Sequence, residues 1–308
     1  MIGRKVLPRQ AADPQLSRRS LLEAMGLLTA LPWALGPGPA HAGALPAKLP
    51  LLLSSVFHHI AIAVPDPAAS ATFYSQLLGG DVLVRRQPNL CYIVDCKPGK
   101  AAGGEFAGSI AISALDASSP DIDKARFHHL GLQAEGYDDD AWRARLIRER
   151  LHDWSQGVFG DIDGIPMRIV GTGTDSGLSA GSTLSEPLHV TEPLLRADGF
   201  DHALLRVWNV EKTVAFYYRM FGLSPSSKRT DVVWFGGTTA RVGLRQVSGG
   251  EGPGIDHCAI RVAGAERSSI NEQLHALGAT PVPSTKGEPD DIVRFEDPDG
   301  LTVELKLV

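Results

Sequence analysis

Three side chains in the C-terminal part of the chain are of types that bind metals, and each lies in a strand-like segment. His202 lies in FDHALLRV, His257 in GIDHCAIRV and Glu304 in LTVELKLV. In each segment apolar residues alternate with the candidate ligand, which is typical of a strand with one buried face. The alternation puts all three candidates on the face opposite the apolar residues, in one cavity. Two imidazoles and one carboxylate with open coordination positions suit Fe(II) and tolerate Mn, Co, Ni or Zn.

A structural role is the alternative for these residues, as polar groups at strand ends that bond to water or backbone. Glu304 argues against it, because an ionised carboxylate in a cavity is costly unless it is paired or bound to a metal. Two histidines at matching positions could hold a cation that meets this need. The sequence therefore predicts one divalent metal held by His202, His257 and Glu304.

The chain is built from four similar units, each of which begins with a histidine strand. The two earlier strands are FHHIAIAV (57–64) and FHHLGLQA (127–134), and all four are followed by a helical pattern and up to three further strands. A helix covers only one face of such a unit, so the other face needs a partner or forms a cavity. We predict an α+β fold of four βαβββ-type modules, paired into two cupped mixed sheets with helices on the outer faces.

A Gly/Ser/Thr-rich stretch, GTGTDSGLSAGSTLSEP, separates the second unit from the third. We predict an N-terminal pair of modules over residues 56–172, a linker over 173–198 and a C-terminal pair over 199–308.

Residues 1–42 have the pattern of a cleaved export signal. Paired Arg18 and Arg19 precede a modestly apolar run, which ends in the small residues around His41. The twin arginines favour the twin-arginine route and a periplasmic location. An anchored or disordered terminus is the alternative, although the apolar run is short for a membrane span.

The N-terminal pair of modules is predicted to be free of metal. His59 and His129 have the same register as the C-terminal histidines, but DIDGIPMRIV aligns with DPDGLTVEL so that Arg168 stands where Glu304 stands. A guanidinium has no lone pair to offer a metal. Ser113, at the position we assign as equivalent in the first module, is no substitute. We expect a structural role, with an anion pocket of Arg168 and the histidines as the alternative.

Composition narrows the class of partner. The 308 residues carry a formal net charge of −5 and show no basic stripe beyond the N-terminus, which argues against nucleic acid. Three cysteines cannot form a disulfide framework. We expect a small-molecule substrate and no membrane association after signal cleavage. The sequence does not assign the oligomeric state, and a homo-oligomer is one of the options.

The repeated motifs resemble the vicinal oxygen chelate superfamily, which includes glyoxalase I, methylmalonyl-CoA epimerase, fosfomycin-resistance proteins and extradiol dioxygenases. The resemblance covers roughly residues 56–308 and depends on the histidine strands, on helix ends such as FYSQLLG and on the closing DPDGLTVEL. It implies metal ligands on the first strand of each paired module and the last strand of the second, which are His202, His257 and Glu304.

Four modules with metal only in the C-terminal pair resemble the two-domain extradiol dioxygenases, which implies oxidation of a catechol-like substrate bound to Fe(II) through vicinal oxygens. The chain departs from that family in one respect. A histidine and a tyrosine for proton transfer are usual near the metal, yet the fourth unit has no tyrosine and its other histidine, His275, lies in a helical pattern. No catalytic residue is therefore assigned.

A glyoxalase- or epimerase-like lyase or isomerase is the main alternative and would need a fourth ligand from ARVGLRQV (240–247). Alternation turns Arg245 toward the cavity, and a bulge would turn Gln246 there instead. Arg245 and Arg294 are candidates to hold a substrate carboxylate, unless they are surface ion-pair partners. A metal-free small-molecule binding protein, as in bleomycin resistance, is the third hypothesis.

Overall fold

The computed structural model describes one compact unit within Leu49–Val308. The described residues are 53–79, 82–85, 90–96, 108–115, 124–155, 157–171, 193–229, 231–264, 266–283 and 289–308. The predicted export signal lies outside them, as does the predicted linker up to residue 192. Among the described helices none is long and apolar enough to cross a membrane.

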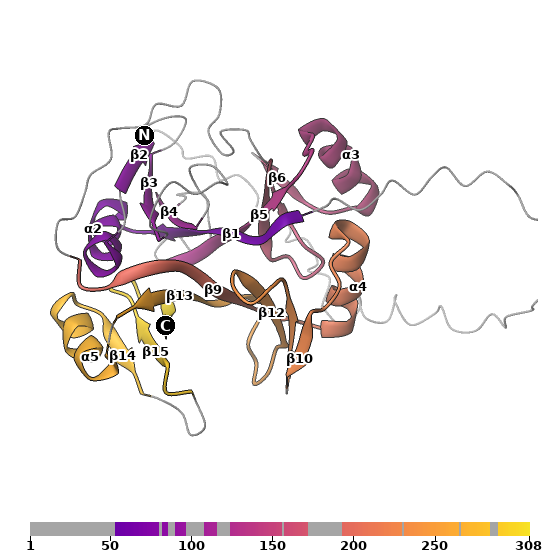
Figure 1. The fold of residues 1–308 in the computed structure, drawn as a ribbon. Coiled ribbons are helices and arrows are strands. Elements are labelled where there is room, and N and C mark those ends of the chain that lie inside the picture. Colours follow the sequence, from indigo (N-terminus) through magenta and orange to yellow (C-terminus); the bar gives the residue numbers. More distant parts are fainter. Residues whose placement is uncertain are drawn as a thin grey trace, which may run out of the picture. The chain divides into compact units, whose positions relative to one another are not determined.

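The N-terminal sheet has eight strands in the order β2-β3-β4-β1-β5-β8-β7-β6 (Figure 1). Its strands are β1 (Leu53–Val64), β2 (Val82–Arg85), β3 (Cys91–Asp95), β4 (Ser109–Ala114), β5 (Arg126–Ala134), β6 (Asp153–Ser155), β7 (Val158–Gly160) and β8 (Pro166–Gly171).

The C-terminal sheet repeats this arrangement in the order β10-β11-β12-β9-β13-β16-β15-β14. Its strands are β9 (Arg196–Val207), β10 (Ser227–Arg229), β11 (Val232–Phe235), β12 (Arg241–Gln246), β13 (Gly254–Ala263), β14 (Thr280–Val282), β15 (Ile292–Glu296) and β16 (Thr302–Leu307). In both sheets the first strands of the two modules pair antiparallel, and the last strand of each module runs parallel to its first.

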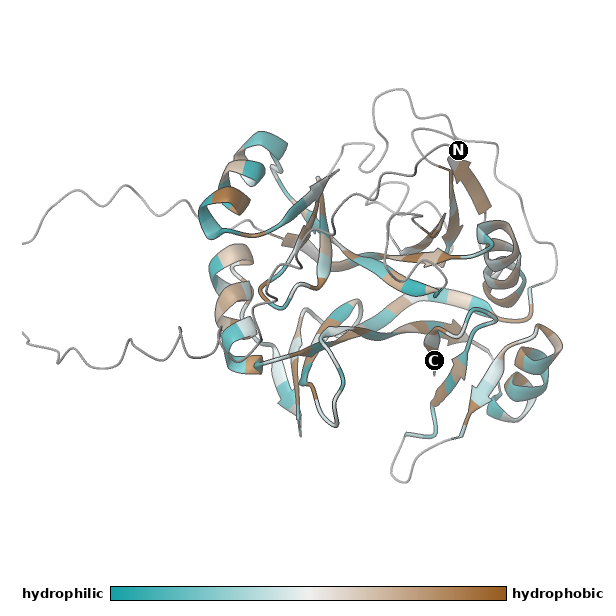
Figure 2. Cartoon of the chain, turned by 180° about the vertical axis from the view of Figure 1, so that it is seen from behind, coloured by the Kyte–Doolittle hydropathy of each residue, from teal (hydrophilic) through white to brown (hydrophobic). Residues whose placement is uncertain are grey.

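Within the described part of the chain, four helices lie on the outside of the two mixed sheets, which confirms the predicted α+β fold. They are α2 (Pro67–Leu78), α3 (Asp139–Glu149), α4 (Val210–Phe221) and α5 (Arg267–Ala276). Along the long central strands the hydropathy alternates between hydrophobic and hydrophilic residues (Figure 2), as expected for sheets with two different faces.

The Phe-Tyr motif of the first and third modules forms the last turns of a helix, and its aromatic side chains are buried. In α2 the aromatic pair and Leu77 are buried, and the helix ends at Gly79, whose φ of 72° favours glycine. In α4 the matching residues are buried and Gly222 ends the helix with a φ of 67°. The motif therefore positions the helix on its sheet.

The tyrosines of this motif bond to the aspartate motif of the other half. The Tyr74 hydroxyl donates to Asp297 Oδ2 at 2.6 Å, and the Tyr217 hydroxyl donates to Asp161 Oδ2 at 3.1 Å. The Oδ1 atom of each aspartate accepts two backbone N–H groups of its own turn. The repeated DIDG and DPDG turns thus tie the N-terminal and C-terminal sheets together.

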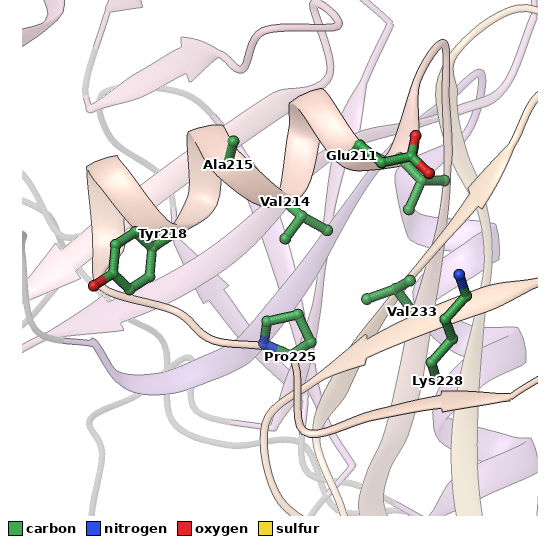
Figure 3. A pocket seen from close by; sticks show the side chains of 8 residues that line it. Glu211, Val214, Ala215, Tyr218, Pro225, Lys228 and Val233 are labelled. Atoms are coloured by element: carbon green, nitrogen blue, oxygen red, sulfur yellow. The ribbon is translucent and has the colours of Figure 1, made fainter.

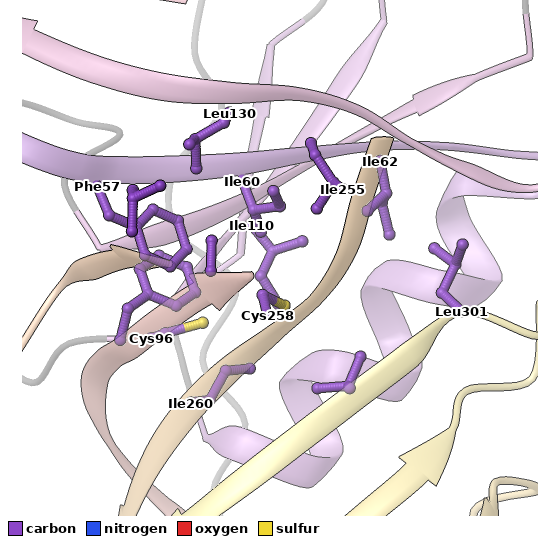
Figure 4. Packing of buried hydrophobic residues seen from close by; sticks show 14 of the residues in the cluster. Phe57, Ile60, Ile62, Cys96, Ile110, Leu130, Ile255, Cys258, Ile260 and Leu301 are labelled. Atoms are coloured by element: carbon purple, nitrogen blue, oxygen red, sulfur yellow. The ribbon is translucent and has the colours of Figure 1, made fainter. Parts of the chain in front are cut away.

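One large hydrophobic cluster contains residues of both sheets. Phe57 of β1 stacks on Phe200 of β9 with ring centroids 4.3 Å apart. Ile60, Cys258 and Ile260 belong to the same buried cluster (Figure 4). The apolar faces of the central strands therefore pack inward, which leaves the faces that carry His202 and His257 turned away from this core.

Candidate metal centre

Strand register brings the three predicted ligands to one place. His202 on β9 pairs with Ala259 on β13, and Ala259 pairs with Glu304 on β16. His257 precedes Ala259 by two residues, so its side chain is on the same face. Because Ala259 has only a methyl group, longer side chains from both neighbouring strands can meet over it.

The ligand atoms of the three residues all lie within 4.8 Å of one another. The Nε2 atoms of His202 and His257 are 3.2 Å apart. Glu304 places Oε2 3.6 Å from His202 Nε2 and Oε1 3.4 Å from His257 Nε2. All three side chains are buried. The geometric convergence expected from the sequence is present.

Each ligand histidine is oriented by the aspartate that precedes it. His202 Nδ1 lies 2.7 Å from Asp201 Oδ2, and His257 Nδ1 lies 3.0 Å from Asp256 Oδ2. An aspartate at Nδ1 favours the tautomer with its proton there and leaves the Nε2 lone pair for a metal. Two such lone pairs and a carboxylate facing one another repel unless a cation lies between them, so the donor set fits a divalent metal.

The charge states agree with this arrangement. Burial would raise the pKa of Asp201, but hydrogen bonds from His202 and Arg241 lower it to about 2. The pKa of Asp256 is also lowered against the effect of burial, by His257 and Arg245. Burial lowers the pKa of His202, although its bond to Asp201 raises it. Ionised aspartates beside a neutral imidazole are the state that metal binding requires.

Arginines connect the site to its surroundings. Arg241 donates to Asp201 at 2.8 Å, and Arg206 donates to Asp256 at 2.6 Å. Arg294 donates from Nε to Glu304 Oε1 at 2.9 Å and from Nη2 to the same oxygen. Of the two predicted substrate-binding arginines, Arg294 thus contacts the ligand carboxylate.

Arg245 forms ion pairs, which is one of the two roles that the sequence left open for it. Its guanidinium donates to Asp256 at 3.1 Å and to Glu251 at 2.9 and 3.2 Å. It therefore supports the aspartate behind His257. Gln246 is exposed, because β12 pairs regularly with β9 from Arg241 to Gln246. The bulge that would turn Gln246 toward the metal is not present in this stretch.

Sequence reasoning missed two features of the site. Asp201 and Asp256 orient the ligands, and the repeated Asp-His dipeptide was a signal for them. Trp234 on β11 lies beside His202, with ring centroids 5.1 Å apart. Alternation in VVWF puts Trp234 on the face opposite the buried Val233 and Phe235.

The N-terminal sheet has the same strand pairing as the C-terminal sheet, but different side chains occupy the matching positions. His59 pairs with Gly131, and Gly131 pairs with Arg168, so Arg168 has the register of Glu304. A Cβ atom on Gly131 would lie 2.1 Å from His59 Nδ1, so the imidazole lies directly on the glycine.

The equivalence assigned to Ser113 was wrong. Ser113 pairs with Ala63, and Ala111 pairs with Ala61, two residues after His59. Ala111 therefore corresponds to Glu304. The two residues share a face, so alternation alone could not separate them.

Four histidines form a chain of contacts in the N-terminal sheet. The Nε2 atoms of His59 and His129 are 3.1 Å apart. The Nδ1 atom of His59 lies 3.0 Å from His58 Nδ1, and that of His129 lies 2.7 Å from His128 Nδ1. Burial, then His129, His58 and Arg168, lower the pKa of His59 well below its ordinary value. Histidines thus stand where the C-terminal sheet has aspartates.

A separate cavity of about 430 Å³ lies between α4 and β10–β11 (Figure 3). Its lining is mostly apolar and includes Val214, Tyr218 and Val233. Val233 and Trp234 point to opposite faces of β11, so this cavity is on the helix side of the sheet, away from the triad.

The model of the Glyoxalase/Bleomycin resistance protein/Dioxygenase superfamily matches residues 56–156 and 199–305. A search of curated protein sequences finds no match to the chain. Among solved structures, an Mn(II)-bound glyoxalase from Novosphingobium aromaticivorans is 16% identical with a TM-score of 0.55, covering 83% of each chain. Homoprotocatechuate 2,3-dioxygenase from Arthrobacter globiformis is 16% identical with a TM-score of 0.55, covering 85% of this chain and 83% of that one.

The halotolerant catechol dioxygenase BphC is 14% identical with a TM-score of 0.54, covering 83% of this chain and 87% of that one. At such identities the structures support the fold, and the family model identifies the family. The chain belongs to the Glyoxalase/Bleomycin resistance protein/Dioxygenase superfamily.

Proposed function

We propose that this protein is a metal-dependent enzyme of the extradiol-dioxygenase type, which oxidises a small substrate that chelates the metal through vicinal oxygens. His202, His257 and Glu304 hold the cation, with Fe(II) favoured and Mn, Zn, Ni or Co as alternatives. The observation that carries the proposal is the convergence of the three ligand atoms within 4.8 Å. A bound divalent metal would act as a Lewis acid and lower the pKa of substrate hydroxyls.

The protein's own groups prepare the site before any substrate arrives. Asp201 and Asp256 hold the two imidazoles by Nδ1, so that each Nε2 keeps its lone pair. Arg241 and Arg245 in turn bond to these aspartates and keep them ionised. Orienting groups of this kind reduce the reorganisation needed at the moment of reaction.

Arg294 is the better of the two predicted substrate-binding residues. It bonds to Glu304 at the centre of the site, whereas Arg245 bonds to Asp256 and Glu251 farther out. If Glu304 binds a cation, a substrate at that cation would lie near the guanidinium of Arg294, which could then bind a substrate carboxylate.

A lyase or isomerase of the glyoxalase or epimerase type is the alternative. It would need a fourth protein ligand on β12, where Gln246 is exposed and Gly243 has no side chain. A metal-free binding protein is a second alternative, and the convergence of two imidazoles and a carboxylate within 4.8 Å argues against it, because this donor set suits a divalent cation. These observations favour the dioxygenase type.

Metal content and oxygen consumption test the proposal. Protein purified without oxygen should contain about one divalent metal per chain and, after loading with Fe(II), should consume oxygen with at least one member of a catechol panel. E304A, which lacks the carboxylate ligand, is the control and should do neither. Metal without oxygen uptake would favour the lyase or isomerase, and protein without metal would favour the binding protein.

The export signal also remains a proposal. Twin-arginine export transports folded proteins, so a cytoplasmic metal could be loaded before transport. If residues 1–42 act in this way, R18K/R19K should keep the protein in the cytoplasmic fraction, whereas the unchanged chain should be found in the periplasmic fraction.

A further inference from the structure

Gly243 and Glu304 occupy related positions in the C-terminal sheet. Glu304 on β16 pairs with Ala259, which follows the ligand His257 by two residues. Gly243 on β12 pairs with Leu204, which follows the ligand His202 by two residues.

The central strands complete this relation. β9 and β13 run antiparallel, with His202 opposite Ala259 and His257 opposite Leu204. An approximate two-fold axis therefore exchanges the two histidines and also exchanges positions 243 and 304. A carboxylate at position 243 would approach the centre from the opposite side to Glu304.

Two side chains fill the space in front of Gly243. A Cβ atom there would lie 2.7 Å from Cζ3 of Trp234 and 2.9 Å from Cδ1 of Leu204, closer than real Cβ atoms approach. On the other side of the axis the residue in the place of Leu204 is Ala259, which is small enough for Glu304 to cross. The two sides of the centre therefore differ in bulk as well as in charge.

Trp234 is held in this position by the residues that orient His202. Its ring meets the His202 ring edge-on, with an interplanar angle of 85°. The Arg241 guanidinium lies 4.6 Å from the centroid of the Trp234 ring and also donates to Asp201, which bonds to His202. This closed ring of contacts fixes the indole against one ligand of the centre.

We propose that Gly243, with Trp234 and Leu204 packed over it, determines specificity by keeping the fourth protein-ligand position of the centre empty. A cation at the triad would then have three protein ligands, and its remaining coordination positions would be open to the vicinal oxygens of a substrate. This inference rests on the proposed function, since it requires a cation at the triad.

The test restores the missing ligand. L204A/W234A/G243E makes the β12 side resemble the side of Ala259 and Glu304, and L204A/W234A opens the same space without adding a ligand. Two quantities are measured without oxygen: the affinity for Co(II), by competition with a chelating dye, and the binding of 4-nitrocatechol to the Co(II)-loaded protein, by absorbance.

We expect the triple variant to bind Co(II) about tenfold or more tightly than L204A/W234A, since groups that only orient a ligand already change affinity by this much. We expect it to bind 4-nitrocatechol roughly tenfold more weakly, because the new carboxylate takes a position that the catechol needs. Equal values for the two variants in both measurements would overturn the inference.

Folding is checked by circular dichroism and thermal unfolding. If the triple variant is unfolded, W234A/G243D, whose shorter acid needs less space, is compared with W234A by the same two measurements and the same criterion. Wild-type protein that binds no Co(II) would instead refute the proposed function, and this result is read before any variant is compared.

Discussion

The two halves of the molecule have the same strand order and pairing, but the side chains at the centre of their sheets differ in charge. In the C-terminal sheet the facing histidines are flanked by Asp201, Asp256 and Glu304. In the N-terminal sheet the facing histidines are flanked by His58, His128 and Arg168, at the matching positions.

The distances between the facing Nε2 atoms are nearly the same, 3.2 Å and 3.1 Å, so the backbone alone does not make a metal site. The difference lies in the groups behind and beside the imidazoles. In the C-terminal sheet the carboxylates supply negative charge that favours a cation at the centre. In the N-terminal sheet the same positions hold histidines and a guanidinium, which supply no negative charge. The two halves therefore share the geometry of the facing histidines and differ in the charges that a cation would meet there.

The largest effect on metal affinity is expected when Glu304 is replaced by arginine, the residue type at the matching position 168. E304R should lower the affinity for a divalent cation by about 100-fold or more, because it replaces a ligand by a positive charge. Isothermal titration with Co(II) measures the change. R168M, made in the other half, is the matched control and should leave Co(II) binding unaltered.

The reverse exchange tests whether charge alone separates the halves. H58D/H128D/R168E gives the N-terminal sheet the three acids of the C-terminal one, and metal content should rise from about one to about two cations per chain. R168E alone should bind the second cation more weakly. A triple variant that folds and still binds a single cation would show that the backbone positions also differ.

Weakening the aspartates should have a smaller effect. D201N and D256N keep the size of each side chain and remove its charge, so each should lower metal affinity by about 10- to 100-fold. The same titration measures both variants. D198N, which alters an aspartate bonded to Arg261 on the rim, serves as the control, and a loss of affinity equal to that of D201N would argue against a specific role for Asp201.

Acid should destabilise the N-terminal sheet through His59. Its pKa is well below the ordinary value of 6.5 in the folded protein, so the unfolded chain binds the proton first. The stability that neutral His59 contributes is present above that value and is lost as the pH falls below it, by up to about 1.4 kcal/mol per pH unit for one proton.

Hydrogen exchange measures this loss separately for each half. The groups that lower the pKa of His59 are His129, His58 and Arg168, so H58N should weaken the dependence on pH. Between pH 7 and pH 5, amides of β1 and β5 should lose protection earlier than those of β9 and β13 in metal-loaded protein. Equal loss in both sheets would contradict the assignment to His59.

A pH effect of the opposite sign is expected at the turn of the N-terminal sheet. Burial raises the pKa of Asp161 to about 7, so the folded protein holds this proton more tightly than the unfolded chain. The stabilisation is full below the ordinary value of 3.8 and is lost as the pH rises through about 7. D161N should flatten this part of the stability profile, as measured by urea unfolding at several pH values. A slope that D161N leaves unaltered would exclude Asp161 as its source.

Much of the fold and of the candidate site could be predicted from local pattern. Alternation of apolar residues with His202, His257 and Glu304 predicted their shared face, since a strand turns successive side chains to opposite sides. The repeat of four histidine strands predicted the paired modules, and a comparison of DIDG with DPDG predicted the place of Arg168.

Other positions depended on contacts between strands far apart in the chain. Alternation repeats every two residues, so it could not decide between Ala111 and Ser113, which pairing with β1 separates. Alternation also could not decide whether Arg245 or Gln246 is on the face of the candidate metal centre. The regular pairing of β12 with β9 shows that it is Arg245. The position of Trp234 beside His202 follows from the order β11-β12-β9, which local pattern does not contain.

The sequence by itself determined which residues could be ligands and which half could hold them, because residue type and alternation are local properties. The tertiary structure decided how the candidate ligands are oriented and which side chains surround them. Those properties depend on Asp201 and Asp256 behind the imidazoles and on Trp234 over Gly243. Asp201 and Asp256 are next to the histidines in sequence, but only the folded backbone turns each carboxylate toward an Nδ1 atom. Trp234 reaches Gly243 only because β11 pairs with β12, and that pairing is a property of the folded chain.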